Sequence, residues 1–286
     1  MTLIELIKQS TETISQLYPE REAREMVLAY LCHILGIQRH THIIEPSYEV
    51  PSDRMDEILS AMERMAAGEP LQYVTGVASF YGRTFHVAPS VLIPRPETEL
   101  LCRFALDSAA GMKKALDLCT GSGCIAWTMA LEKPGVEVTA VDISEDALQI
   151  ASTQDFAEEI SRSGAVAPTF IKTDVLSDEL PSDLKYDLLL SNPPYVMDKE
   201  KQLMRTNVLD YEPHLALFVP DDDPLKFYRS IAHKAPRLLA EHGVGIVEIN
   251  EALGPETASL FIEAGFTDVR LENDLNDRPR FVIFRR

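Results

Sequence analysis

The sequence is short of cysteine, of long apolar runs and of basic charge, and each shortage narrows the classes of protein to which it can belong. The four cysteines, at positions 32, 102, 119 and 124, form no Cys-x-x-Cys pair and no ligand set with histidine. They therefore predict no zinc or other metal site. No window of about 18 apolar residues occurs, so we expect no membrane-spanning helix. The N-terminus, MTLIELIKQSTETIS, predicts no signal peptide. We therefore expect a soluble, cytoplasmic protein.

The shortage of basic residues argues against nucleic acid as a direct partner. The chain has 27 lysines and arginines against 45 acidic residues, a net charge of −18. Such a surface repels nucleic acid phosphates at long range. Hydrophobic residues make up 45% of the 286 residues, which is ordinary for a globular protein of one large or two modest domains.

The first 70 residues have the periodicity of helices, and they predict a small N-terminal helical domain. Apolar residues recur at helical spacing from Leu3 to Leu17, and a second helix is expected from Pro19 to Gly36. A third is expected after Ser52 and Asp53, which we interpret as its N-cap. Residues 71–93 are aromatic and β-branched, with breaks at glycines, and predict a β-hairpin linker.

Residues 94–286 predict an α/β domain in which strands alternate with helices. The expected strands are Lys114–Leu118, Glu137–Asp142, Thr169–Lys172, Tyr186–Ser191, 243–249 and 280–284. Consecutive strand–helix units imply a mainly parallel, Rossmann-like sheet with helices on both faces. In such sheets ligands bind beyond the carboxyl ends of the strands.

A glycine-rich turn follows the first of these strands. This glycine loop comprises Cys119, Thr120, Gly121, Ser122 and Gly123. Glycine permits a positive φ and close approach of the backbone to a ligand, and the helix that follows offers free N–H groups. The pattern fits a dinucleotide fingerprint, and Asp117 with the two glycines also fits the S-adenosylmethionine form. The loop alone leaves both cofactors open.

The next two strands end in further candidate cofactor ligands. Asp142 stands at the carboxyl end of its strand, where a carboxylate can accept hydrogen bonds from ribose hydroxyls. Asp174 and Val175 are expected at the end of the following strand, where an adenine would lie. Asp142 could instead only cap the helix that begins after it, but its register with the glycine loop favours ribose binding.

The segment Asn192, Pro193, Pro194 and Tyr195, here called the diproline elbow, decides between the cofactors. It follows a buried strand, and its prolines fix two φ angles and remove two N–H donors. The side-chain oxygen of Asn192 and the backbone oxygen of Pro193 can each accept one N–H of a substrate NH2, while Tyr195 packs on its flat face. An amide nitrogen held in this way could accept a methyl group without a strong base.

The motifs together resemble the HemK/PrmC family of protein-glutamine methyltransferases. Besides the elbow, the resemblance rests on the segments 68–73, 93–99 and 211–217, in the order of that family. It implies a class I S-adenosylmethionine-dependent fold and methylation of the Gly-Gly-Gln glutamine of class I peptide chain release factors, with the N-terminal helices docking the substrate. It also implies that the glycine loop, Asp142, Asp174, Val175 and Asn192 bind the cofactor and that the elbow binds the substrate amide. We expect a monomer.

Several positions depart from the family's pattern, and other functions compete with this interpretation. Glu248-Ile249-Asn250 and Asp277 each miss a glycine that is common in the family near the C-terminus. Cys119 replaces a usual glycine, and Val175 replaces an aromatic residue that often covers adenine. A glutamine methyltransferase of a ribosomal protein would share the same motifs. An adenine-N6 nucleic-acid methyltransferase would share the elbow but would need a basic groove. An NAD-dependent dehydrogenase would explain only the glycine loop, and a non-catalytic scaffold would not need Asn192 and Asp142.

Overall fold

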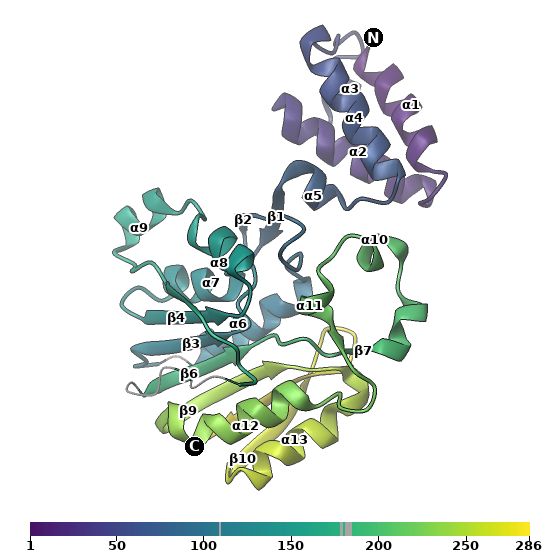
Figure 1. Ribbon diagram of the computed structural model, residues 1–286. Helices are drawn as coiled ribbons and strands as arrows, with labels where there is room; N and C mark the ends of the chain where they lie inside the picture. The colour runs from purple at the N-terminus through teal and green to yellow at the C-terminus, as the bar shows by residue number, and fades with distance from the viewer. Residues whose placement is uncertain (109, 178–179, 181–184) are drawn as a thin grey trace. The chain divides into compact units, whose positions relative to one another are not determined.

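A computed structural model describes residues 1–108, 110–177, 180 and 185–286. The chain divides into two units by its internal contacts (Figure 1). The smaller unit contains Met1–Val77 and also Arg205–Tyr211, whereas the larger contains Ala78–Met204 and Glu212–Arg286. The smaller unit is therefore discontinuous in sequence, because a segment from late in the chain completes it.

The smaller unit is helical, as its apolar periodicity predicts. Its elements are α1 (Leu3–Ile14), α2 (Glu20–Leu35), α3 (Thr41–Ile44), η1 (Ser52–Arg54), α4 (Met55–Ala66), α5 (Leu71–Thr75) and α10 (Thr206–Leu209). Thr2 and Glu5 form a reciprocal capping box at the start of α1. Gly36 ends α2 with a φ of 64°.

One predicted helix cap is wrong, although the helix itself begins after Ser52 and Asp53 as predicted. Ser52 and Asp53 do not cap α4; they lie in the 3-10 turn η1, and Arg54 occupies the N-cap position without a side-chain hydrogen bond. Pro51 precedes this turn with a φ of −54°, a value close to the one that its ring imposes.

The late segment is bonded to the helices that precede it. Arg205 forms an ion pair with Glu22 of α2 over 2.9 Å, and the Tyr211 hydroxyl donates to the carbonyl of Ala67 over 3.1 Å. Gly68, with a φ of 101°, lies beside the Tyr211 ring. These contacts belong to the smaller unit alone.

The larger unit contains a seven-stranded sheet with helices on both faces. The strands of this sheet are β3 (Lys114–Leu118), β4 (Glu137–Asp142), β5 (Thr169–Lys172), β6 (Tyr186–Ser191), β9 (Leu239–Glu248), β10 (Asp268–Asn273) and β11 (Pro279–Arg285). Two smaller sheets pair β1 (Val77–Phe80) with β2 (Arg83–His86) and β7 (Val196–Met197) with β8 (Phe218–Val219). The helices of the larger unit are α6 (Pro96–Ser108), α7 (Cys124–Glu132), α8 (Glu145–Ser152), α9 (Ala157–Ser163), η2 (Asp198–Leu203), α11 (His214–Leu217), α12 (Lys226–Leu238), η3 (Glu251–Leu253) and α13 (Gly254–Glu263).

The sheet order is β10-β11-β9-β6-β3-β4-β5. Strands β9, β6, β3, β4 and β5 are parallel, and β11 is antiparallel to both of its neighbours. The predicted, mainly parallel α/β fold is confirmed. The sequence did not predict β10, because its pattern Asp-Val-Arg-Leu-Glu-Asn exposes most side chains at the edge of the sheet.

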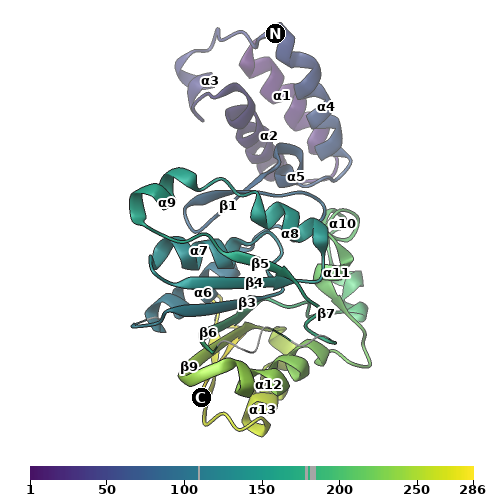
Figure 2. The same cartoon turned by 60° about the vertical axis from the view of Figure 1, so that its left-hand side comes forward.

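Helices lie on both faces of this sheet (Figure 2), and an apolar core fills the space beneath them on each face. Helices α6 and α7 pack on one face, against Ala115, Leu188 and Ile246. Helices α12 and α13 pack on the other, against Leu116, Leu189 and Val247. Successive residues of β3, β6 and β9 thus alternate between the faces, as strand geometry requires.

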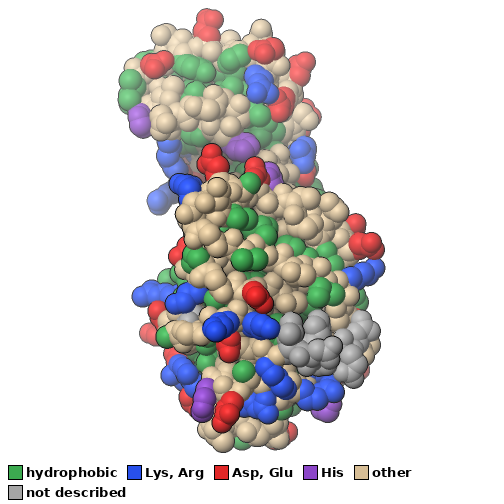
Figure 3. All heavy atoms as spheres, turned by 90° about the vertical axis from the view of Figure 1, so that its left-hand side faces the viewer, with side chains coloured by type: hydrophobic (Ala, Val, Ile, Leu, Met, Phe, Trp, Pro, Cys, Tyr) green, Lys and Arg blue, Asp and Glu red, His purple; other side chains and the backbone are tan. Residues whose placement is uncertain are grey.

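The hairpin β1–β2 packs on the α6/α7 side of the larger unit, where Phe80 and Phe85 are buried. Arg83 fixes it by ion pairs with Glu132 of α7 and Glu159 of α9. On the face in Figure 3, basic and acidic side chains of the larger unit are interspersed, despite the net negative charge. No helix in the described ranges has the length and hydropathy needed to span a membrane.

We predict that Gly245→Ala will destabilise the larger unit. An added Cβ would lie 2.0 Å from the ring of Phe284, which stacks on Phe261 with ring centroids 3.9 Å apart. The ring must move, at a cost of about 1–3 kcal/mol or more. Thermal melting should show a clear fall in the midpoint, whereas the exposed Glu241→Ala in the same strand should leave it in place. Equal midpoints for the two variants would show that this packing is not tight.

Candidate functional site

The candidate site lies at the topological switch point of the parallel sheet, where the strand order reverses at β3. From β3 the chain builds outward through β4 and β5, and β6 and β9 then lie on the opposite side of β3. Leu118 pairs with Ser191 and also with Val141. The glycine loop, Asp142 and the diproline elbow therefore leave neighbouring strands at the same edge. Switch points of this kind are the usual ligand sites of open α/β sheets.

The glycine loop is held open by positive φ angles and backbone bonds. Cys119, Gly121 and Gly123 have φ values of 60°, 55° and 79°. Cys119 thus adopts the left-handed conformation that a glycine would favour. At Gly123 an added Cβ would come within 3.0 Å of Ala151 in α8, whereas at Gly121 nothing lies within 4 Å. The loop therefore packs closely behind Gly123 and leaves space at Gly121.

Asp142 connects the loop to the start of α8. Its Oδ2 accepts from the Gly121 N–H over 2.8 Å, and its Oδ1 accepts from the Ser144 N–H over 2.9 Å. Burial raises the pKa of Asp142, and these backbone N–H groups oppose that rise. Each carboxylate oxygen keeps a second lone pair for a ligand. Ser144 itself caps α8, so helix capping is not the role of Asp142.

A glutamine not predicted from the sequence ties the loop to the hairpin. Gln154 exchanges two hydrogen bonds with the backbone of His86, over 2.8 and 2.9 Å. Its amide also donates to the Ser122 carbonyl over 3.1 Å. Its neighbours in the sequence, Thr153 and Asp155, are also polar, so no local pattern reveals these partners.

Asp117 is buried at the base of the loop. Its Oδ2 accepts from the Thr120 hydroxyl over 2.5 Å, while Oδ1 has no hydrogen-bond partner in the described part of the chain. Burial raises the pKa of Asp117 to about 7, and the Thr120 bond opposes this rise. Asp117 does not line the cavity described below.

The diproline elbow is fixed by side chains from distant parts of the chain. The Asn192 amide donates to Thr98 Oγ1 over 3.1 Å, and the Tyr195 hydroxyl donates to Glu248 Oε1 over 3.0 Å. The Tyr195 carbonyl accepts from the Asn250 side chain over 3.2 Å. The sequence thus predicted a stiff elbow but not the groups that hold it.

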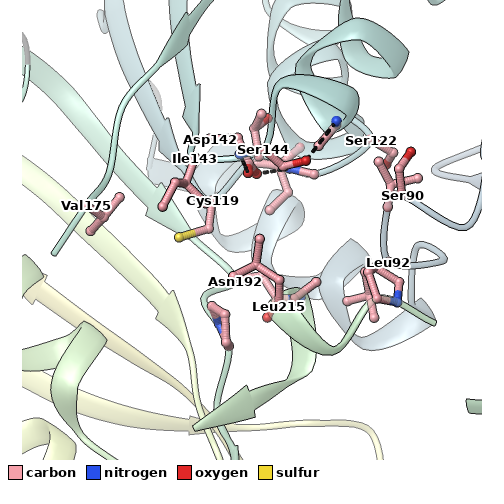
Figure 4. A pocket seen from close by; sticks show the side chains of 18 of the residues that line it. Ser90, Leu92, Cys119, Ser122, Asp142, Ile143, Ser144, Val175, Asn192 and Leu215 are labelled. Atoms are coloured by element: carbon pink, nitrogen blue, oxygen red, sulfur yellow. Dashed lines mark hydrogen bonds between the residues drawn. The ribbon is translucent and has the colours of Figure 1, made fainter. Parts of the chain in front are cut away.

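A cavity of about 320 Å³ opens between these segments (Figure 4). Of the predicted site residues, it is lined by Cys119, Thr120, Gly121, Ser122, Asp142, Asp174, Val175, Asn192 and Pro194. Gly123 does not line it. Pro193 and Tyr195 line an adjoining recess of about 40 Å³, which shares Asn192 with the cavity. The structure thus brings together most of these residues, with the elbow between the two spaces.

Asp174 and Val175 follow β5 rather than end it, because the strand stops at Lys172. The prediction that they end this strand is wrong. The Val175 carbonyl accepts from Ser230 over 2.6 Å and from Lys234 over 2.5 Å. Val175 is only 3% exposed, so it offers little surface to a flat ring.

Several lining residues were not predicted, among them Ile143, Lys226, Phe227, Leu92 and Leu215. Ile143 is 44% exposed although it is apolar, and it follows Asp142 at the carboxyl end of β4. An apolar residue directly after the strand-end carboxylate was the available signal for Ile143. Leu92 and Leu215 come from segments that sequence periodicity does not place near the sheet.

An ion pair joins two of the motif segments beside the cavity. Arg95 bonds Glu212 Oε1 over 2.5 Å, and the Ile93 N–H donates to Glu212 Oε2 over 3.3 Å. Glu212 is buried at 4% exposure, so this pairing also compensates its charge. In the described residues, no group of three histidine, cysteine or acidic side chains could hold a metal ion.

Comparisons with known proteins point to one family. Residues 97–211 match the methyltransferase small domain, and residues 5–76 match the PrmC N-terminal domain. A release factor glutamine methyltransferase of Bacteroides thetaiotaomicron is 38% identical over 275 residues, covering 96% of this chain and 97% of the relative. One of Flavobacterium psychrophilum is 35% identical, covering 97% of each. The solved hMettl16 catalytic domain has a TM-score of 0.52 at 13% identity and 83% coverage of both chains, which shows a shared fold.

We predict that Asp117 makes folding stability fall as pH rises from about 4 to about 7. Its pKa is about 7 in the folded protein and about 3.9 when unfolded, so the folded state binds more protons in that window. Asp117→Asn should abolish this contribution, of roughly 1 kcal/mol per pH unit. Denaturant unfolding at pH 5 and pH 8 measures it, with the exposed Asp155→Asn as control. Parallel pH profiles for wild type and Asp117→Asn would contradict the assignment.

Proposed function

The chain belongs to the family of release factor glutamine methyltransferases, and we propose that it methylates the side-chain amide nitrogen of the Gly-Gly-Gln glutamine in class I peptide chain release factors, using S-adenosylmethionine. The family that the sequence motifs predicted is thereby confirmed. The observation that carries the proposal is that two relatives with this name match nearly the whole chain. It is supported by the cavity, which Asn192 of the diproline elbow and residues of the glycine loop line together.

The residues around the cavity fit S-adenosylmethionine. Asp142 keeps free lone pairs for hydroxyl donors after its two backbone bonds. Ile143 and Phe227 offer apolar surface for a flat ring, a role that Val175 cannot fill alone. Asp142, Asp146 and Asp174 also line the cavity, and their carboxylates suit a cationic ligand. When bound, S-adenosylmethionine supplies an electrophilic methyl group.

The elbow would hold the amide nitrogen for attack. Asn192 Oδ1 and the Pro193 carbonyl accept the two N–H groups of the glutamine side chain. An amide nitrogen is a weak nucleophile because its lone pair is delocalised, so its orientation is the main contribution that the protein can make. As the new N–C bond formed, the S–CH3 bond of the sulfonium would break and the nitrogen would become cationic. It would then lose one N–H proton to water, so no strong base is required. Tyr195 and Pro193 line the recess beside Asn192, where the side chain would enter.

The helical unit would contact the release factor itself. Residues 5–76 match a domain found in this family, and the net charge of −18 favours a partly basic protein over nucleic acid as the partner. Translation factors act in the cytoplasm, where we therefore place this enzyme. We expect it to act as a monomer.

The proposal predicts that the protein labels one glutamine. Purified protein, labelled S-adenosylmethionine and a purified class I release factor should give a methylated Gly-Gly-Gln glutamine on mass mapping. Asn192→Ala should reduce the rate by at least about 100-fold, because it removes a positioning acceptor, with an unchanged melting midpoint. Label on a nucleic acid or on a ribosomal protein, or full activity of Asn192→Ala, would refute the proposal.

We further predict that Asp142→Ala weakens binding of S-adenosylmethionine by about 1.5–3 kcal/mol, the usual range for hydrogen bonds to a charged group. Calorimetric titration of the free protein measures this loss. The control is Glu145→Ala, which removes a neighbouring, exposed carboxylate whose side chain is 83% exposed. Equal dissociation constants for the two variants would reject the role of Asp142.

A further inference from the structure

A buried chain of hydrogen bonds runs from Asn192 into the core of the larger unit. The Asn192 amide donates to Thr98 Oγ1 over 3.1 Å, and the Thr98 hydroxyl donates to Glu248 Oε2 over 2.8 Å. Thr98 and Glu248 are 2% and 1% exposed. Thr98 lies in the first turn of helix α6 and Glu248 ends strand β9, so three distant segments meet behind the elbow.

The direction of this chain follows from the chemistry of its last member. An ionised carboxylate can only accept hydrogen bonds. The Tyr195 and Thr98 hydroxyls therefore both donate to Glu248, one to each oxygen. The single hydroxyl hydrogen of Thr98 is thereby used, and its oxygen can only accept from Asn192.

This constraint selects one of two possible orientations of the Asn192 amide. The two ends of a side-chain amide have nearly the same shape, and only hydrogen-bond partners distinguish them. The NH2 end must face Thr98, and the oxygen then faces away from it. Asn192 lines the cavity (Figure 4), so the elbow presents acceptors to a ligand.

We propose that Thr98 and Glu248 are positioning residues that keep the Asn192 oxygen toward the substrate, and that they thereby select a carboxamide over a carboxylate. The proposal rests on the proposed function. A glutamine NH2 donates to two acceptors at the elbow. A glutamate carboxylate would meet the same acceptors with lone pairs only, and would be repelled. If Asn192 could turn over, its NH2 would face the substrate and this selectivity would be lost.

The ionisation of Glu248 makes this chain of hydrogen bonds depend on pH. Burial raises the pKa of Glu248, while bonds from Thr98 and Tyr195 and the charge of Arg280 oppose that rise. The titratable groups that face it are Arg280, Glu97, Tyr195, Tyr228, Cys102 and Cys124. A protonated Glu248 can donate to Thr98, which frees the Thr98 hydrogen for the Asn192 oxygen. Methyl transfer should therefore fall on the acid side as Glu248 takes up a proton.

The test compares Thr98→Val, which keeps the shape and removes the hydroxyl, with Thr98→Ser, which keeps the hydroxyl. We expect Thr98→Val to lower kcat roughly 10- to 100-fold, the equivalent of losing one buried hydrogen bond, with little change in KM. Thr98→Ser should recover most of the activity. Thr98→Val should also lose the acid-side fall of kcat. Equal kcat values for the two variants at equal melting midpoints would overturn the proposal.

A competitor tests the selectivity directly. A release factor with glutamate in place of the Gly-Gly-Gln glutamine should inhibit wild type and Thr98→Ser weakly, and Thr98→Val several-fold more strongly. A purely structural role for Thr98 would leave this inhibition unchanged, and that result would refute the selection of carboxamide.

A third measurement tests the orientation of Asn192 without measuring methyl transfer. In the free protein, NMR should show slow solvent exchange of the Asn192 side-chain NH2 in wild type and Thr98→Ser, and fast exchange in Thr98→Val. Identical exchange in all three would refute the orientation whether or not methyl transfer occurs. Slow exchange in a wild-type protein that transfers no methyl group would refute the proposed function. It would still support the orientation of Asn192 by Thr98 and Glu248.

Discussion

The register between β3 and β6 determines where the chemistry of this protein can occur. Leu118 pairs with Ser191, and the Ser191 hydroxyl also donates to the Leu118 carbonyl over 2.8 Å. Because both strands run in the same direction, the segments that follow them begin at the same edge. A shift by one residue would turn the core-facing side chains of a strand to the opposite face. The apolar cores on both faces therefore fix the position of Asn192 beside the glycine loop.

The sequence predicted the parts of the fold whose signal is local. The strands β3, β4, β5 and β6 have the predicted bounds, because turn residues or charged residues flank each of these short segments. Strand β10 was missed, since most of its side chains are exposed at the sheet edge and carry no apolar pattern. The α4 cap was misassigned, because serine and aspartate are common both in caps and in the short turns that precede helices.

The sequence predicted those residues of the candidate site that belong to one continuous motif. It did not predict those that come together from distant segments. The glycine loop and Asn192 were found because their residue types are unusual for a strand end. Thr98 and Glu248 were not assigned a role, although both lie in segments that the sequence singled out, because a hydrogen bond between residues 150 positions apart has no local pattern. For Val175, the sequence left open what covers an adenine. Ile143 is exposed and Phe227 lines the cavity, so both offer apolar surface there, and neither belongs to the glycine loop or the elbow.

The return of residues 205–211 to the helical unit affects the order of events during translation. A ribosome releases the N-terminal helices first, and continuous domains can then fold as they emerge. Here α2 cannot gain its ion pair to Arg205, nor Ala67 its bond from Tyr211, until the chain has been made through residue 211. Strands β3, β4, β5 and β6 have all been synthesised by then. The smaller unit thus completes its contacts only after four strands of the larger unit have been made, and a nascent polypeptide stalled before residue 205 would carry it unfinished.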